Sequence, residues 1–273
     1  MYDTHIHTNC SHDSNQTIDE ICLSAISKGL KAVSLTDHVD LLVYSDEKNR
    51  NTLLGTAECT RYAKKTYGDK LEIFAGIEIA MPILDMEKSK HYIDMVNADI
   101  VLGSVHSFMA GENLVRFPRD DLSEAAISVE DLYKHVGIYY ENILALASKA
   151  DIDVLCHLTY PIRYTNQKYG RNIEISVFSD ILTEILKTII TRNIALEANT
   201  AKIEDNIDDL SPTCDILKQY YDMGGRMVTL GSDAHVCERI GNSFQAVKAK
   251  LADIGFDSYV YFKNRKPMFV SLS

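Results

Sequence analysis

The chain has 273 residues, a length that α/β barrels often use as a single domain, and its 46% hydrophobic and 25% charged content is ordinary for a globular protein. This composition excludes a disordered or collagen-like chain, and no apolar run approaches the ~20 residues that a membrane-spanning helix needs. The formal net charge of −11 disfavours a general nucleic-acid binder, whereas a small phosphorylated substrate needs only one or two local cations.

Short β-branched runs alternate with longer helical patterns along the whole chain. The predicted strands are Tyr2–Ile6, Ala32–Leu35, Leu71–Gly76, Ile100–Gly103, Asp153–Cys156, Ile194–Glu197, Arg226–Leu230 and one near Ser258–Phe262. The predicted helices are Ile18–Lys28, Asn51–Tyr67, Val129–Lys149, Ile175–Thr191, Thr213–Met223 and Ser243–Ile254. Seven or eight parallel βα units favour a closed or nearly closed barrel in one α/β domain, and an open doubly wound sheet is the alternative.

The longest irregular stretches each follow a predicted strand. They are Val39–Arg50, Ser107–Ser128 and Leu158–Asn172. Loops at the carboxyl ends of barrel strands usually shape the substrate pocket, so we expect a pocket between these three stretches.

Two histidines lie two residues apart in the first predicted strand. His5 and His7 therefore point to the same face, where neutral imidazoles can hold one metal ion. Taken alone, this pattern is weak, because two ordinary polar residues at a strand end would look the same.

Further polar residues stand at or just beyond the ends of the later strands. They are His38, Glu78, His106, His157, Asp233 and His235, and His12 follows the first strand. Parallel strands bring their carboxyl ends to one face, so seven of the nine histidines and two carboxylates should gather there. This number of ligands fits two or three metal ions; a polar network without metal is the alternative.

The segments DTHIHTNCSHD, LTDH, GIE, GSVH, CH and GSDAH, in this order, resemble the PHP (polymerase and histidinol phosphatase) family from residue 3 to residue 235. The resemblance implies a distorted (β/α)₇ barrel, similar to a TIM barrel, with three divalent metal ions at the carboxyl ends of its strands. We therefore expect residues 1–273 to form a single PHP-type metal-dependent phosphoesterase domain.

The resemblance also assigns the metal ligands. The first ion would be held by His5, His7, Glu78 and Asp233; the second by Glu78, His106 and His157, with Glu78 bridging; and the third by His12, His38 and His235. Zinc, iron and manganese all suit such mixed histidine and carboxylate ligands, so the metal stays open.

Three residues near these ligands are candidates for catalysis. Asp37 could transfer a proton or, alternatively, position His38 or cap the following turn. Arg163 and Arg116 follow His157 and His106 and could bind a phosphate, although a surface salt bridge is the plain alternative. Cys10 and Cys156 also neighbour the ligands, and we expect both to be packing residues rather than nucleophiles.

The resemblance is strongest to stand-alone histidinol-phosphate phosphatases. It implies that a metal-bridging hydroxide attacks L-histidinol phosphate and releases L-histidinol and phosphate, a step of histidine biosynthesis. The alternatives are another phosphoesterase of the family, acting on a nucleotide, an oligonucleotide or phosphotyrosine, and a non-catalytic metal-binding regulatory module. We expect no nucleic-acid or membrane partner. Scattered cysteines and an N-terminus without a leader-like segment predict a cytoplasmic protein.

Overall fold

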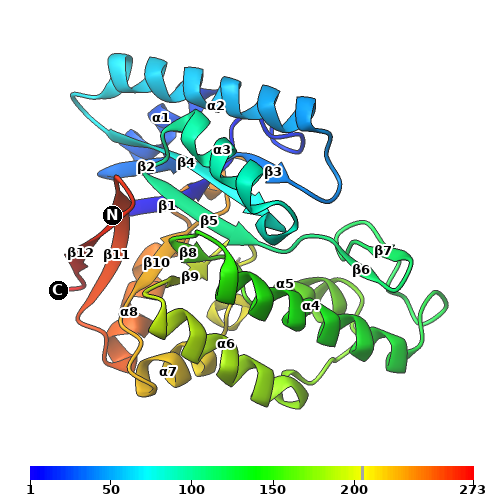
Figure 1. The fold of residues 1–273 in the computed structure, drawn as a ribbon. Coiled ribbons are helices and arrows are strands. Elements are labelled where there is room, and N and C mark those ends of the chain that lie inside the picture. The colour runs from blue at the N-terminus through cyan, green and yellow to red at the C-terminus, as the bar shows by residue number, and fades with distance from the viewer. Residues whose placement is uncertain (204–205) are drawn as a thin grey trace.

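Seven parallel strands form the centre of the computed structural model, which describes residues 1–203 and 206–273 (Figure 1). They are hydrogen-bonded in the order β1-β2-β4-β5-β8-β9-β10, and the short β3 pairs with the second half of β4. The strands of this sheet are β1 (Tyr2–Ile6), β2 (Ala32–Leu35), β3 (His38–Asp40), β4 (Glu72–Ala80), β5 (Ile100–Ser104), β8 (Val154–Leu155), β9 (Ala195–Asn199) and β10 (Val228–Gly231).

The last parallel strand returns to the first and nearly closes the sheet. The amide of Asp233 donates to the carbonyl of His5 at 2.8 Å, and the amide of His7 donates to the carbonyl of Ala234 at 3.0 Å. These bonds lie at the carboxyl end of β1 and just beyond the end of β10, where Ile6 and Ala234 form a parallel bridge. The predicted α/β barrel in a single domain is therefore confirmed, and the open doubly wound sheet is excluded.

Helices surround the strands (Figure 1). They are α1 (Ile18–Ser27), α2 (Asp46–Tyr67), α3 (Met86–Val96), α4 (Val129–Lys149), α5 (Tyr160–Ile162), α6 (Ser179–Thr191), α7 (Cys214–Asp222) and α8 (Phe244–Ile254). In α4, the Ser128 hydroxyl accepts the amide of Asp131, which caps the first turn. Leu132, Val136 and Ile143 recur at helical spacing and are fully buried, and each such side chain contributes about 1.5–3 kcal/mol.

A C-terminal hairpin of β11 (Ser258–Lys263) and β12 (Lys266–Ser271) covers the amino ends of the barrel strands. Tyr261 stacks on Tyr2 at the start of β1 with ring centroids 4.0 Å apart, and Lys263 pairs with Glu72 at the start of β4. The strand predicted near Ser258–Phe262 therefore exists but is antiparallel to its partner and lies outside the barrel. The hairpin does not cover the carboxyl ends of the parallel strands, where the loops lie.

Several elements were not predicted from the sequence. The short β3 runs into the expected irregular stretch Val39–Arg50. Helix α3 is mostly polar, and its buried face includes only three apolar residues, Tyr92, Ile93 and Val96, so its helical pattern is weak. The predicted irregular stretches contain a hairpin of β6 (Phe108–Ala110) and β7 (Asn113–Val115) and the helical turns that begin with α5.

Candidate metal centre

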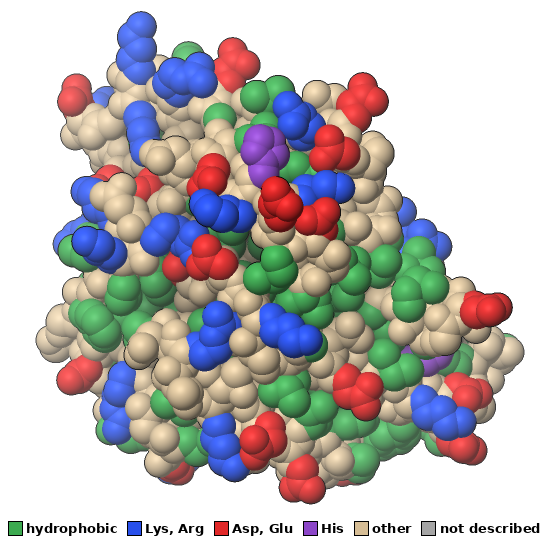
Figure 2. Space-filling view, viewed as in Figure 1, with side chains coloured by type: hydrophobic (Ala, Val, Ile, Leu, Met, Phe, Trp, Pro, Cys, Tyr) green, Lys and Arg blue, Asp and Glu red, His purple; other side chains and the backbone are tan. Residues whose placement is uncertain are grey.

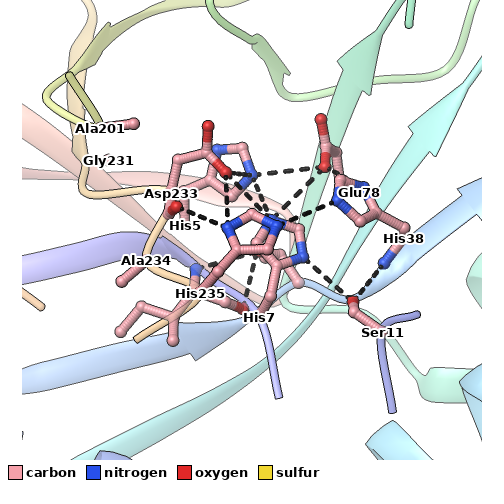
Figure 3. Close-up of polar contacts among 12 residues, drawn as sticks. His5, His7, Ser11, His38, Glu78, Ala201, Gly231, Asp233, Ala234 and His235 are labelled. Carbon is pink, nitrogen blue, oxygen red and sulfur yellow. Dashed lines mark hydrogen bonds and ion pairs between the residues drawn. The ribbon is translucent and has the colours of Figure 1, made fainter. Parts of the chain in front are cut away.

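The carboxyl ends of the parallel strands meet at the floor of a cavity of about 650 Å³. Figure 3 shows His5, His7, His38, Glu78, Asp233 and His235 pointing toward one another from segments that are far apart in the sequence. Strand β1 supplies His5, with His7 just after it, β4 supplies Glu78, and Asp233 follows β10. The barrel closure described above is therefore what brings these ligands together.

Glu78 lies at the centre of the cluster and is fully buried. One carboxylate oxygen, Oε1, lies 2.9 Å from His157 Nε2 and 3.0 Å from His106 Nε2. The other oxygen, Oε2, lies 2.6 Å from His38 Nδ1 and 3.5 Å from His5 Nε2. The two oxygens thus face two different sets of imidazoles, as a carboxylate that bridges two ions would.

Asp233 faces the two histidines of the first strand. Its Oδ1 lies 3.3 Å from His7 Nε2 and 3.6 Å from His5 Nε2, and the two Nε2 atoms are 3.0 Å apart. The backbone of Asp233 has a positive φ of 50°, a conformation that is uncommon for a residue other than glycine. The tight turn after β10 places this carboxylate beside His5 and His7, the two histidines expected with it around the first ion.

Contacts of the second ring nitrogen, Nδ1, fix the direction of three of the imidazole rings. His5 Nδ1 is 2.6 Å from Glu197, His7 Nδ1 is 3.2 Å from the Ser11 hydroxyl, and His235 Nδ1 is 2.9 Å from the Asp233 carbonyl. With a proton on each Nδ1, the Nε2 lone pair points into the cluster. This is the arrangement that metal-ligating histidines usually have.

The spacing of the nitrogen atoms also fits metal ions. The Nε2 atoms of His38 and His235 are 3.4 Å apart, as are those of His106 and His157. Two imidazole nitrogens on one tetrahedral ion would be about 3.3 Å apart, given bonds of about 2.0–2.1 Å. The buried Oε2 of Glu78 has no hydrogen-bond donor other than the imidazoles that face it, the nearest being His38 Nδ1 at 2.6 Å, so an ion could take the place of their protons.

The charges in the cluster are strongly coupled. Burial raises the pKa of Glu78, but His106, His38 and His5 outweigh this effect and hold it well below its usual range. Burial and the neighbouring imidazoles lower the pKa of His7 well below its usual range. Burial also lowers the pKa of His38, yet Glu78 and other acidic groups raise it to about 10. A metal ion must displace the proton of His38, so metal binding should release protons.

A third group of nitrogen atoms belongs to His7, His38 and His235. Asp13 faces two of these residues, with one carboxylate oxygen 3.5 Å from His38 Nε2 and the other 3.5 Å from His235 Nε2. Asp13 was not predicted as a site residue, although it is the last residue of the quoted segment DTHIHTNCSHD. Its position directly after His12 was the available signal.

The structure does not bring His12 into this group. Its two ring nitrogens lie 2.8 and 3.0 Å from the Tyr44 hydroxyl, and its Nε2 lies 3.2 Å from Arg119. The ring of His12 lines the same cavity, with its centroid 5.7 Å from that of His38. In this conformation His12 forms part of the cavity wall rather than of the predicted third group.

The proton-transfer role considered for Asp37 does not fit its surroundings. This carboxylate is buried and accepts hydrogen bonds from the amide and hydroxyl of Thr8, from Ser11 and from Thr56, at 2.6–2.9 Å. These four donors occupy both oxygens, and Asp37 does not line the cavity. Asp37 therefore ties the loop after β1 to α2, which matches the positioning alternative.

Arg163 and Arg116 both line the cavity, as expected for residues that could bind a phosphate. Arg163 is buried, donates to Asn199 Oδ1 at 2.8 Å and lies 3.5 Å from Asp233 Oδ2. The side chain of Arg116 is more exposed, and its backbone amide donates to Asp120 Oδ2 at 2.6 Å. Three further basic residues line the same cavity and were not predicted: Arg119, Lys202 and Arg239.

Comparison with known proteins decides the family. The sequence model of the PHP domain matches residues 3–201. The chain belongs to the PHP family. It is 31% identical to a probable histidinol-phosphatase of Clostridium acetobutylicum, over 97% of this chain and 98% of that protein. It is 28% identical to a probable histidinol-phosphatase of Thermotoga maritima, over the full length of both proteins.

The fold of this PHP domain also matches a solved structure. The crystal structure of histidinol phosphate phosphatase from Lactococcus lactis, in complex with zinc, L-histidinol and phosphate, superposes with a TM-score of 0.76. The two chains are 23% identical, and the match covers 98% of each. The predicted family and the predicted barrel are both confirmed.

Acidic and basic side chains are interspersed on the face of the PHP domain seen in Figure 2, and they form no continuous basic track there. A protein that follows a nucleic-acid backbone usually carries such a track. Within the described residues, none of the helices is long and apolar enough to span a membrane.

Glu197 is a site residue of this PHP domain that sequence reasoning did not assign. It is fully buried on β9 and accepts from His5 Nδ1 at 2.6 Å, from the amide of His157 at 2.7 Å and from Asn199 Nδ2 at 3.1 Å. The signal in the sequence was Glu197-Ala198-Asn199, because alternate residues of a strand share one face.

Replacing Glu197 by Gln should lower metal affinity by about 10- to 100-fold, since three donors converge on two oxygens, one of which becomes an NH2 group that can only donate. Metal titration of the stripped protein measures this change. Glu184→Gln, an exposed carboxylate on α6, is the matched control. A folded Glu197→Gln protein that binds metal as tightly as wild type would show that Glu197 does not orient His5.

Proposed function

We propose that this PHP domain is a metal-dependent phosphomonoesterase that hydrolyses L-histidinol phosphate to L-histidinol and phosphate in histidine biosynthesis. The observation that carries the proposal is the meeting of Glu78 and Asp233 with six histidines at the floor of a cavity that Arg163 lines. Relatives that match nearly the whole chain are named histidinol-phosphatases, which supports this substrate among those that the family uses. The six free cysteines are consistent with a cytoplasmic location, which we propose as well.

We propose three divalent metal ions, with zinc, iron or manganese as the candidates. The contacts support His5, His7, Glu78 and Asp233 for the first ion and Glu78, His106 and His157 for the second. For the third ion they support His38 and His235, with Asp13 facing both, while the place of His12 in this set stays a prediction. When bound, such ions lower the pKa of water and neutralise the oxygens of a phosphoryl group.

The side chains above the cluster would bind the rest of the substrate. Arg163 is held by Asn199 and can offer its remaining N–H groups to a phosphate, and Arg116 is the second candidate. The rings of Tyr160 and Tyr164 line the cavity, where they can contact the imidazole of histidinol. Asp37 would act indirectly, by holding the loop that carries His7 and Ser11.

The test is an assay with the metal-loaded protein on three substrates: L-histidinol phosphate, p-nitrophenyl phosphate and a dinucleotide. We expect kcat/KM for histidinol phosphate to exceed the other two by about 100-fold or more, because its organic half adds contacts in the transition state. A chelator should abolish turnover, and zinc, manganese or iron(II) should restore it.

Two outcomes of this assay would contradict the proposal. Equal rates on the three esters would indicate another phosphoesterase of the family. Hydrolysis of one of the other esters without hydrolysis of histidinol phosphate would indicate the same. No hydrolysis of any ester by protein that is shown to contain its metal would indicate a binding module without turnover.

A further inference from the structure

Two cysteines meet beside the candidate metal centre. Cys10 lies in the loop after β1, between His7 and His12, and Cys59 lies on α2. Their sulfur atoms are 4.0 Å apart, although the residues are separated by 49 positions in the chain. Both side chains are only partly buried, unlike Cys156, which is fully buried as a packing residue.

The surface of α2 leaves room for the sulfur of Cys10. Gly55 lies four residues before Cys59 and therefore on the same face of the helix. A Cβ atom at Gly55 would lie 2.6 Å from Cys10 Sγ, so a larger residue there would push the Cys10 sulfur aside. The hydroxyl of Thr52, one turn earlier, donates to the Cys10 carbonyl at 3.3 Å. The loop is thus seated closely on α2 at the position where Cys59 faces it.

Small solutes can reach Cys10 of this pair. Cys10 lines an open cavity together with Lys48, Thr52 and His12, and His12 also lines the cavity over the candidate metal centre. The sulfur atoms need to approach by about 2 Å to reach the disulfide bond length of about 2.0 Å, which side-chain rotation and a small loop movement can supply.

We propose that Cys10 and Cys59 are an oxidation site of this protein, where hydrogen peroxide or a small hydroperoxide drives disulfide formation. The O–O bond of the peroxide breaks as one oxygen is transferred to the Cys10 sulfur, which becomes a sulfenic acid, and the other oxygen leaves with the thiol proton as water or an alcohol. The sulfur of Cys59 then attacks the Cys10 sulfur, and the sulfenic hydroxyl leaves with the Cys59 proton as a second water. The pair of thiols loses two electrons, which the peroxide accepts.

The disulfide would act on the metal centre through Ser11. The Ser11 hydroxyl contacts His7 Nδ1 at 3.2 Å, donates to Asp37 at 2.9 Å and accepts the amide of His38 at 3.1 Å. A pull on the neighbouring Cys10 toward α2 shifts this hydroxyl relative to both histidines. The oxidised protein should therefore hold its metal less tightly.

The test exposes the metal-loaded full chain to a small excess of hydrogen peroxide and compares wild type with Cys59→Ser and with Cys214→Ser, a partly buried cysteine on α7 that serves as control. We expect non-reducing peptide mapping to find a Cys10–Cys59 cross-link in wild type and Cys214→Ser. Both should lose about 10-fold or more in metal affinity and in phosphatase activity, and reduction should restore both. Cys59→Ser should keep its metal and its activity.

Two results in wild type would overturn the proposal: no cross-linked peptide, or a cross-link with unchanged metal affinity. An equal loss of metal from Cys59→Ser would overturn it too, because it would place the oxidation on the metal ions or their ligands. Peptide mapping and metal titration require no turnover. Their outcome is therefore independent of whether histidinol phosphate is the substrate.

Discussion

Replacement of Glu78 by Gln should cost about 1000-fold or more in kcat/KM, a larger loss than removal of either candidate phosphate-binding arginine. One oxygen of Glu78 faces His106 and His157, and the other faces His38 and His5. The substitution keeps the size of the side chain but removes its charge and replaces one oxygen by an amide NH2 group, which cannot ligate a cation. Two ions should be disturbed together.

Metal analysis checks this expectation. The purified Glu78→Gln protein should contain fewer metal ions than wild type, whereas Glu72→Gln should match wild type. Glu72 begins the same strand but pairs with Lys263 at the opposite end of the barrel, so it controls for loss of a carboxylate from β4. Circular dichroism shows whether each variant folds. Full metal occupancy in a folded Glu78→Gln protein would contradict a bridging role.

The gathering of the candidate ligands could be predicted from the sequence because parallel strands impose it. Glu78 and Asp233 stand at strand ends 155 positions apart, the difference of their residue numbers, and no local pattern connects them. Yet any closed parallel sheet places both at one rim. The prediction therefore needed only approximate strand positions: the predicted strand ended at Gly76, four residues before β4 ends at Ala80, and this error did not affect it.

Residues whose role depends on side-chain direction were harder to predict. Asp37 and Asp13 both adjoin a histidine in the sequence, but the hydroxyls around Asp37 turn it into the core while Asp13 faces the cavity. His12 matches the family pattern, yet Tyr44 and Arg119 hold its ring at the cavity wall. Tertiary contacts decide the directions of these side chains, and such contacts cannot be read from the neighbouring residues in the sequence.

The C-terminal hairpin shows a different limit. The run near Ser258–Phe262 has the composition of a strand. It was therefore predicted as a strand of a seventh or eighth βα unit. Its partner, β12, begins with Lys-Pro and is largely exposed, so it offers neither clear alternation nor a buried face. Whether a strand joins a barrel or covers its end depends on the strand with which it pairs. The residues of the strand itself do not determine that pairing.

Replacing Arg163 by Ala should lower kcat/KM for the phosphate ester by about 10- to 1000-fold, from the loss of about 1.5–3 kcal/mol of charge-assisted hydrogen bonding together with lost positioning. Asn199 holds the guanidinium at 2.8 Å, beside Asp233 at 3.5 Å, so its direction is fixed before substrate binds. Arg163 lies outside the proposed ligand sets. The variant should therefore keep its metal content, which separates its loss from that of Glu78→Gln.

Arg163→Lys should recover part of this activity, because a lysine keeps the charge but lacks the planar fork that matches a phosphate. Inhibition by inorganic phosphate should weaken in the order wild type, Arg163→Lys, Arg163→Ala, since the product offers the same oxygens to the guanidinium. Lys168→Ala removes a basic residue from the exposed end of the same segment and should change neither quantity. An unchanged kcat/KM in a folded, metal-loaded Arg163→Ala protein would show that this arginine only anchors Asn199 and Asp233 and that the phosphate is bound elsewhere in the cavity.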